Sequence, residues 1–551
     1  MLLKDNRNNN FIKQAGILAA AGIISRIIGL LYRSPLHGVI GSLGLGYYQS
    51  AYNYYTIILL ISSYSIPAAI SKVIAGKLAV KEYRNAHRIF RCALAYVLVV
   101  GGIASLFLYF CAGLFVSPEA IPVLRTFAPT IFIYGILGVL RGYFQAHNSM
   151  TQTSVSQVLE QIANAVVSVG VAYLLIFHTM GTMEMPVNEG DRITRAINGA
   201  VGSALGTGAG VLVALLFMLG VYILNKGMFE RRIVADRQEK EDSYGEILKT
   251  ITFVVTPFIL STAIYNLSGA INNTIYTKVF PLLRPTSGVD IYSGWGVFAG
   301  QALTISNIPI AFASAMASAM IPSVATQMAE KNVEGAKNKI GVAIKTTMVI
   351  SIPCAVGLFA LARPITGLLF RNTAAEEDMA TYLLMALSLS VIFYALSTLS
   401  SSILQGLGKV NAPIFNAGFA LIGQTVLALV LLLFTNMDLY SIAIANTVYA
   451  GIMCLLNHRS VRRAVGYRQE VKRTFVIPAV AALCMGLVSR LLYQGLYLWT
   501  ESSHLSVIIS IAVGAVIYFI LLLLLGGLTS EELMSFPKGR VLARMAKKIK
   551  S

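Results

Sequence analysis

Charged residues are scarce in this chain. Aspartate, glutamate, lysine and arginine make up 12% of its 551 residues, whereas hydrophobic residues make up 56%. A soluble domain usually carries about a quarter charged residues, so this sequence has too little polar material for a water-facing surface. The scarcity excludes an ordinary soluble enzyme and predicts a protein that lies largely within a membrane.

Cysteine and histidine are also few and unclustered. The five cysteines fall in or beside apolar stretches without a CxxC pair, and the six histidines stand singly. This pattern excludes a disulfide framework and a zinc site, so we expect no bound metal. The sequence also lacks the GxxxxGK[ST] loop of ATPases and the HExxH and GxSxG motifs of hydrolases. We therefore expect a transporter and not an enzyme, with no cofactor.

Long apolar segments are the main feature that is present. Each is about 20 residues long, which is the length that a helix needs to cross a hydrocarbon core of about 30 Å. They predict an all-α integral membrane protein with about fourteen transmembrane helices. The predicted spans are approximately 14–33, 47–75, 91–115, 121–145, 154–178, 196–224, 249–275, 296–325, 340–362, 380–405, 412–435, 438–457, 474–498 and 505–526.

Basic residues gather in every second loop between these spans. The net charge of +19 comes from such loops and from the tail, while the intervening loops are acidic or nearly neutral. Alternation of this kind indicates membrane topology and not nucleic-acid binding. It predicts a multi-pass protein of the cell membrane with both termini in the cytoplasm.

An internal repeat divides the chain. Residues 65–72 (SIPAAISK) resemble 320–327 (MIPSVATQ), and the FQA sequence at 144–146 resembles LQG at 404–406. The two pairs are offset by similar amounts, which indicates two related halves. The predicted organisation is an N-lobe at 1–224, a charged cytoplasmic linker loop at 225–248, a C-lobe at 249–460, and the last two spans with a basic tail at 461–551.

Arginines inside the first span are candidate substrate-binding residues. Arg26 lies about 12 residues into the span, near the bilayer midplane at 1.5 Å per residue. A charge at that depth is costly unless it faces a cavity or a partner. We expect Arg26 to line a central cavity, with a structural ion pair as the alternative. Arg33 lies on nearly the same face but close enough to the outer interface to reach it.

A polar stripe follows one face of the fifth span. Gln157, Glu160, Gln161 and Asn164 have the spacing i, i+3, i+4, i+7. Arg141, near the inner end of the fourth span, is the expected partner of Glu160. The pair either fixes helix packing or forms part of the inner mouth of a transport cavity, and the sequence leaves both interpretations open.

Further polar residues occur in later spans. They are candidates for an ion site or for cavity lining, although such residues are often only interhelical hydrogen-bonding groups. Five tyrosines begin the second span, where an interfacial aromatic belt is expected. The polar candidates are Asn266, Asn273, Gln301, Asn416 and Thr447, and the tyrosines are Tyr47, Tyr48, Tyr52, Tyr54 and Tyr55.

Several motifs resemble those of known flippases. The sequence VLRGYFQ at 139–145, followed by SQVLEQ at 156–161, resembles the stage V sporulation protein B group of polysaccharide-biosynthesis flippases. SRIIG at 25–29 resembles a first-helix motif that this group shares with the MurJ lipid II flippases. GSLGLGY at 41–47 and IPAAISK at 66–72 also fit. The resemblance is strong in the first half of the chain and mainly architectural in the second.

This resemblance implies the multidrug/oligosaccharidyl-lipid/polysaccharide exporter superfamily. The implied fold has two pseudo-symmetric six-helix lobes around a central cavity and two extra C-terminal helices. The implied function is translocation of an undecaprenyl-diphosphate-linked sugar, with lipid II as the expected substrate, from the inner to the outer leaflet of a bacterial membrane by alternating access. Arg26 matches the family's cavity arginine, which engages the diphosphate, and the last two spans could hold the lipid tail.

Other readings stay open. Alternatives are another polysaccharide-lipid flippase, a drug or cation antiporter of the same fold, and, less favoured, a membrane glycan-processing enzyme or an assembly scaffold. Expected partners are the lipid-linked oligosaccharide, the phospholipid bilayer and the cell-wall synthesis machinery. Energy would come from a coupling ion (Na⁺ or H⁺) or the membrane potential. The family's sodium-site aspartates in the seventh and eleventh helices have no counterpart in those spans.

Overall fold

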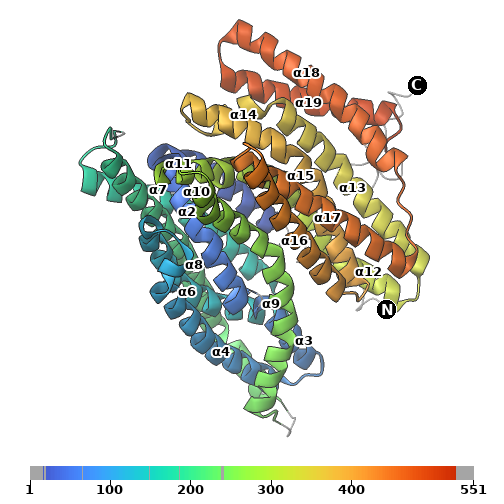
Figure 1. Ribbon diagram of the computed structural model, residues 1–551. Helices are drawn as coiled ribbons and strands as arrows, with labels where there is room; N and C mark the ends of the chain where they lie inside the picture. Colours follow the sequence, from blue (N-terminus) through green and yellow to red (C-terminus); the bar gives the residue numbers. More distant parts are fainter. Residues whose placement is uncertain are drawn as a thin grey trace. The chain divides into compact units, whose positions relative to one another are not determined.

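The computed structural model describes residues 17, 20–64, 66–147, 149–184, 186–236 and 241–528 (Figure 1). Every regular element in these ranges is helical. Eleven helices in the described part of the chain are long and apolar enough to cross a membrane, and a helix lies at each predicted span. The prediction of an all-α membrane protein is confirmed.

The chain forms two compact units, Met1–Gly296 and Val297–Ser551. The first unit runs from blue to green in Figure 1. Its elements are the helix Ala20–Leu31, then α2 (Arg33–Leu59), η1 (Leu60–Tyr64), α3 (Ile66–Ala79), α4 (Tyr83–Phe110), α5 (Ala112–Phe115), η2 (Pro118–Ala120), α6 (Ile121–Ala146), α7 (Met150–Met180), α8 (Glu189–Val234), α9 (Tyr244–Thr274), η3 (Ile275–Val279), α10 (Phe280–Leu283) and α11 (Gly288–Trp295).

The second unit begins within a π-helical segment that continues from α11. Its buried core joins α12, α13, α15, α17, α18 and α19, and α18 and α19 lie side by side as an antiparallel pair (Figure 1). Its elements are η4 (Gly296–Ala302), α12 (Leu303–Ala329), α13 (Val333–Ala360), α14 (Ala362–Leu369), α15 (Ala374–Gly406), α16 (Asn411–Phe434), α17 (Leu439–Val465), η5 (Lys472–Val476), α18 (Ile477–Thr500) and α19 (Ser503–Leu524).

The boundary between these units differs from the predicted boundary between lobes. The prediction placed it in the loop at 225–248, whereas the contacts place it at Gly296. The reason is that α9, the seventh predicted span, packs on α2, α3 and α4. The division into functional lobes at 1–224 and 249–460 stays a prediction.

The predicted linker loop is partly helical. Helix α8 continues ten residues beyond the predicted span and ends at Val234. On this extension Phe229 is buried against Tyr143, with ring centroids 5.1 Å apart, while Lys226 and Glu230 lie on the exposed face. The charges that suggested a loop therefore belong to the solvated face of an amphipathic helix end.

The first helix ends at a glycine. The helix that contains Arg26 continues into α2 and breaks at Gly41, whose φ of 70° and ψ of 177° suit only glycine. The break leaves carbonyl groups without helical partners. Arg195 of α8 donates from Nη2 to the carbonyls of Val39, at 2.9 Å, and Met183, at 3.3 Å. The predicted loop between the first two spans is therefore this sharp turn.

The tyrosines of the second span are not an interfacial belt. Tyr47, Tyr48, Tyr54 and Tyr55 are all buried in the core of the first unit. The rings of Tyr55 and Phe127 stack with centroids 4.7 Å apart, and Tyr54 hydroxyl lies 2.7 Å from Thr274 Oγ1. The expectation was wrong because these residues face other helices and not the lipid.

The internal repeat has a structural counterpart. In the first unit, a Cβ built on Gly142 of α6 would lie 2.8 Å from the carbonyl oxygen of Pro67 in α3. In the second unit, a Cβ built on Gly406 of α15 would lie 2.8 Å from the carbonyl oxygen of Ile321 in α12. Each half therefore brings its two repeated motifs together at one close helix crossing, and a glycine permits the approach.

Candidate functional site

A buried ion pair joins α6 and α7. Arg141 is 5% exposed, and its Nη2 donates to Glu160 Oε2 at 2.8 Å while its Nε donates to Ser156 Oγ at 2.9 Å. The guanidinium of Arg141 therefore has two partners on α7, a carboxylate that makes a charge-assisted hydrogen bond and a hydroxyl group. The predicted contact between Arg141 and Glu160 is confirmed. A role for the pair in substrate binding stays a prediction.

The polar stripe of α7 faces the helix Ala20–Leu31. A Cβ on Gly29 would lie 3.5 Å from Gln161 Oε1, and Asn164 Nδ2 donates to Tyr32 hydroxyl at 3.5 Å. Both contacts join residues 132 positions apart, which means that the two helices run parallel in register. One turn earlier, Arg26 therefore lies at the level of Gln157.

Arg26 carries a charge with no salt-bridge partner in the described part of the chain. Its side chain is exposed, and it lies three residues before Gly29, so the two positions adjoin on one helix face. Arg141 at a similar level is neutralised by Glu160. Of these two arginines, Arg26 is therefore the one whose guanidinium can bind an added anion. The alternative of a structural ion pair finds no partner among the described residues.

Asn164 is committed to a hydrogen-bond network. It is buried, its Oδ1 accepts from Ser168 Oγ at 2.8 Å and from Thr207 Oγ1 at 3.5 Å, and Thr207 lies 3.1 Å from Tyr48 hydroxyl. The network ties together α2, α7 and α8. Gln157 is half-buried on the same stripe. The structure therefore gives Asn164 a packing role and leaves Gln157 available at the level of Arg26.

The other candidates of the first unit lie apart from this layer. Arg33 is half-buried and has a partner within the protein, as has Asn266. Asn273 is fully buried and donates to Ser50 Oγ at 3.0 Å. The bond of Asn273 to Ser50 joins α9 to α2 and is typical of interhelical hydrogen bonding.

The polar candidates of the second unit occupy three separate places. Gln301 and Asn372 exchange two amide hydrogen bonds of 2.9 Å. Asn416 donates to Asn457 Oδ1 at 2.8 Å. Thr447 donates to the carbonyl of Ala443 at 3.0 Å within its own helix. The structure does not bring these three side chains into one cluster, and the described residues contain no group of three His, Cys, Asp or Glu side chains that could hold a metal.

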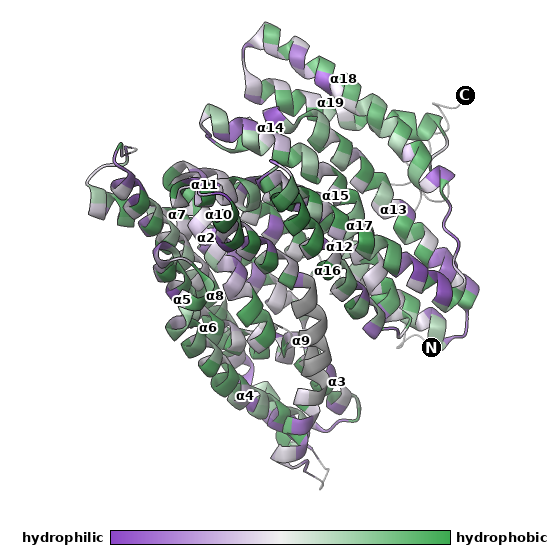
Figure 2. Cartoon of the chain, in the orientation of Figure 1, coloured by the Kyte–Doolittle hydropathy of each residue, from purple (hydrophilic) through white to green (hydrophobic). Residues whose placement is uncertain are grey.

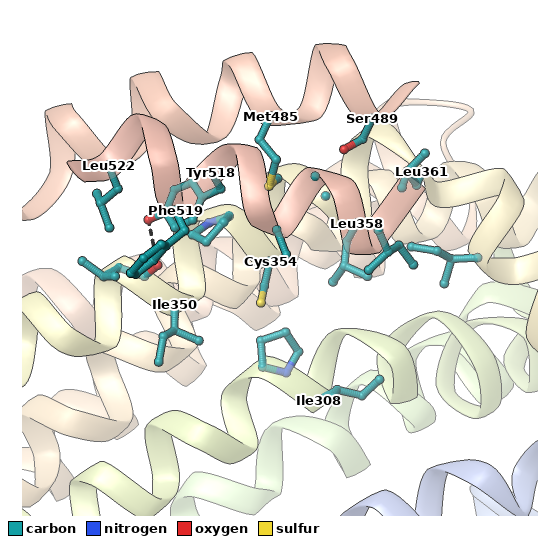
Figure 3. A pocket seen from close by; sticks show the side chains of 18 of the residues that line it. Ile308, Ile350, Cys354, Leu358, Leu361, Met485, Ser489, Tyr518, Phe519 and Leu522 are labelled. Carbon is teal, nitrogen blue, oxygen red and sulfur yellow. Dashed lines mark hydrogen bonds between the residues drawn. The ribbon is translucent and has the colours of Figure 1, made fainter. Parts of the chain in front are cut away.

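An apolar cavity of about 510 Å³ lies in the second unit. Helices α13 and α19 form most of its wall, with contributions from α12 and α18. Figure 3 shows aliphatic and aromatic side chains around it, and the dashed line marks the bond of 2.7 Å from Tyr518 hydroxyl to the carbonyl of Val349. That bond leaves the lining almost without free polar groups. The last two spans, which the resemblance suggests could hold the lipid tail, both line this cavity, and its use by a lipid stays a prediction.

Sequence reasoning missed three buried polar residues. Ser156 is the second partner of Arg141, Arg195 supports the turn at Gly41, and Asn457 is the hub that links Asn416 to Ser401. Arg195 stood one residue before a predicted span and Asn457 at the end of another, so both seemed interfacial. The signal for Ser156 was available, because it lies one turn before Glu160 on the same face.

Comparison with known proteins places the chain in a family. The sequence model of the family described as "Lipid II flippase MurJ" matches residues 81–513. The chain is 23% identical over 539 residues to lipid II flippase MurJ of Bacillus subtilis (strain 168), covering 93% of this chain and 94% of that protein. It is 24% identical over 545 residues to stage V sporulation protein B of the same organism, covering 97% and 99%.

Solved structures agree on the fold. The chain matches a structure of lipid II flippase MurJ in an inward closed conformation with a TM-score of 0.63 at 16% identity, over 92% of this chain and 97% of that one. It also matches an inward-facing multidrug resistance MATE family transporter of the MOP superfamily with a TM-score of 0.56 at 20% identity, over 81% and 94%. Since the family match extends over most of the sequence, this protein belongs to the lipid II flippase MurJ family.

Proposed function

We propose that this protein moves an undecaprenyl-diphosphate-linked sugar, lipid II, from the inner to the outer leaflet of the bacterial cell membrane by alternating access. The observation that carries the proposal is the family match over residues 81–513. The unpaired charge of Arg26 beside a polar helix face supplies an anion-binding group, and the apolar cavity of the second unit supplies a place for a hydrocarbon chain.

Arg26 would hold the diphosphate. A guanidinium presents a planar fork of donors that matches two phosphate oxygens at once. The half-buried amide of Gln157 at the same level could hydrogen-bond the sugar. In this arrangement the buried pair of Arg141 and Glu160 positions α7, which carries the polar stripe, and does not itself bind the charge.

The lipid tail would occupy the apolar cavity. An isoprenoid chain has no hydrogen-bonding groups, so it needs a wall without free polar atoms. The lining of Ile350, Leu358, Phe519 and Leu522 provides one (Figure 3). Gly514, in the wall on α19, lets α18 pack closely, since a Cβ there would lie 2.2 Å from Ser489 Oγ.

The proposed topology places the basic loops and both termini in the cytoplasm. The head group would then enter from the cytoplasmic leaflet. Partners would be the lipid-linked sugar, the surrounding phospholipid and the cell-wall synthesis machinery. Energy would come from a coupling ion or from the membrane potential.

Translocation of fluorescent lipid II in proteoliposomes tests the proposal. We expect labelled lipid to leave the leaflet that corresponds to the inner leaflet of the cell only when the protein is present. A membrane-impermeant quencher measures this movement. Export of a cationic drug without lipid movement would instead identify an antiporter of the same fold. Hydrolysis of the lipid-linked sugar would identify an enzyme. Accumulation of lipid II on the cytoplasmic side after depletion in cells is the complementary result that we expect.

A further inference from the structure

A second cavity in the first unit has a different character from the apolar one. It measures about 840 Å³ and lies among α4, α6, the end of α8 and the start of α9. Four basic side chains, Arg84, Arg88, Arg91 and Lys226, line it together with the acids Glu230 and Glu241. The lining therefore carries an excess of two positive charges, with His87 in addition.

The inner part of this cavity is apolar. Leu94, Ile136, Leu140 and Leu219 line it, and Tyr222 and Phe229 add aromatic surface. A free inorganic anion would gain nothing from contact with this apolar wall. A ligand with a negative head and a hydrocarbon body satisfies both parts of the lining.

The cavity lies where both helices leave the apolar zone. On α4 the exposed apolar residues Leu98 and Val99 follow Arg91 by two turns, and on α8 Leu224, which is 86% exposed, comes directly before the residues around Lys226. Figure 2 shows hydrophilic colouring where the beginning of α4 meets α3 and α9. Arg91 and Lys226 therefore stand at one membrane surface, with lipid-facing side chains just beyond them.

Part of the positive charge is already balanced. Arg88 pairs with Glu241 and its guanidinium lies 4.5 Å from the ring centroid of Tyr244. The backbone amide of Arg84 donates to Asp236 at 2.8 Å, which places a carboxylate near this arginine without pairing its guanidinium. Lys77, which lies outside the cavity, forms ion pairs with the neighbouring acids Glu82 and Asp242 at 2.8 and 2.5 Å. These two carboxylates therefore do not neutralise the basic side chains that line the cavity.

Lys77 keeps one of those acids charged. Its hydrogen bond to Glu82, and a second from Asn85, hold the pKa of Glu82 below its ordinary value of 4.5. Both partners of Lys77 lie on the polar side of α4 and the α8–α9 connection. The ion pairs there fasten the two segments that form the mouth of the cavity.

Unsatisfied groups remain at the cavity. Arg91 is exposed and makes no hydrogen bond or ion pair with the described residues, while Lys226 has only an exposed contact of 3.6 Å with Glu230, which contributes little. Arg88 Nε and His87 Nδ1 are buried without a partner in the described part of the chain. Buried polar atoms of this kind are usually satisfied by a bound group.

We propose that this cavity binds the head group of an anionic phospholipid from the leaflet that faces α4, with its phosphodiester between Arg91 and Lys226 and its acyl chains along the exposed apolar faces of α4 and α8. On the topology of the proposed function, that leaflet is the cytoplasmic one, which attracts juxtamembrane basic residues. The site is distinct from Arg26, so the lipid would be a resident of the transporter and not its cargo.

Native mass spectrometry of the full chain in detergent tests the site without any transport. The probes are phosphatidylglycerol, phosphatidylcholine, undecaprenyl diphosphate and inorganic phosphate. The test variant is Arg91→Gln with Lys226→Gln, and the matched control is Arg462→Gln with Arg463→Gln, which removes two exposed charges on α17. Thermal unfolding of both variants verifies that they fold.

We expect wild type to prefer phosphatidylglycerol to phosphatidylcholine, and the test variant to lose about 30-fold in affinity for phosphatidylglycerol, since each basic side chain near a membrane surface contributes about 1 kcal/mol. The control should change by less than about threefold on the same basis.

An equal loss in both variants would show that general surface charge causes the effect, and would overturn the site. Displacement by inorganic phosphate alone, or tighter binding of undecaprenyl diphosphate, would overturn the lipid assignment. A binding-competent chain that moves no lipid II would leave this site standing and refute the proposed function.

Discussion

The guanidinium Nη2 of Arg141 lies 2.8 Å from the carboxylate Oε2 of Glu160, with the arginine side chain 6% and the glutamate side chain 16% exposed. The pair joins the end of α6 to the first half of α7, close to the crossing of Gly142 on Pro67. An ion pair at this depth is stable only while both partners are present, because each charge offsets the desolvation of the other.

Removing one partner should therefore cost more than removing both. Arg141→Met or Glu160→Leu alone leaves one buried charge, and loss of one partner of a buried pair costs about 3–5 kcal/mol. We expect the lower end of that range because Glu160 is partly exposed. The double variant should be more stable than either single variant in thermal unfolding in detergent.

The control for the pair is Arg125→Met, which removes an exposed arginine from the other end of α6. Its unfolding temperature should stay close to that of the wild type. Strictly additive losses in the Arg141 and Glu160 variants would mean that the two groups do not interact.

Much of the first unit follows from simple patterns. The i, i+3, i+4, i+7 spacing of the α7 stripe and the depth of Arg141 were enough to predict their contact, because a helix fixes both face and height. The repeat of the IP and FQA or LQG motifs also predicted which helices correspond. These inferences depend on local geometry, which the sequence encodes directly.

Other features depend on tertiary partners that periodicity does not reveal. Tyr47 and Tyr55 were expected at the interface, but neighbouring helices bury them. The charged stretch from Asn225 to Val234 resembled a loop because only one large side chain in it, Phe229, is buried. One buried residue is too few to show a helical periodicity. The partners of Asn457 lie on two other helices, α15 and α16, far from it in sequence, so no window of the sequence contains them.

Arg26→Ala should abolish lipid II translocation while leaving folding intact. The exposed side chain has no ion-pair partner in the described residues, so its loss removes binding and not packing. Arg26→Lys keeps the charge but loses the bidentate fork, and we expect at most partial rescue. Rates in proteoliposomes and unfolding temperatures measure the two effects separately. Arg125→Ala is the matched control and should retain the wild-type rate; a fully active Arg26→Ala would remove the diphosphate assignment.

Gly46→Ala should strongly destabilise the first unit. A Cβ at Gly46 would lie 1.8 Å from the backbone carbonyl oxygen of Tyr292, where α2 crosses α11. Backbone cannot rotate away as a side chain can, so the helices must separate, and overpacking costs about 1–3 kcal/mol or more.

The matched control is Gly38→Ala, in the helical segment just before the break at Gly41, where a Cβ would meet no atom within 4 Å. Alanine there should stabilise by about 0.5–1 kcal/mol, because glycine loses more backbone entropy in a helix. Thermal unfolding should thus shift in opposite directions for the two variants. If Gly46→Ala unfolds no earlier than Gly38→Ala, the close approach of α2 and α11 is refuted.

Translocation should depend on membrane potential and not on sodium. The chain has no nucleotide-binding loop, and Asn416 and Thr447 are separate and engaged with other protein groups in the second unit. The proposed cargo carries a negative diphosphate. When the cytoplasm is electrically negative, outward movement of each negative charge is favoured by about 2.3 kcal/mol per 100 mV, so the potential can drive export without a carboxylate-lined ion site.

The dependence of the translocation rate on potential can be measured by imposing a potassium-diffusion potential of either sign on proteoliposomes, with and without sodium. We expect rates that change with the sign of the potential and are indifferent to sodium. A rate that follows sodium alone, unchanged when the potential is reversed, would contradict the prediction and direct attention back to Asn266, Asn416 and Thr447 as ion ligands.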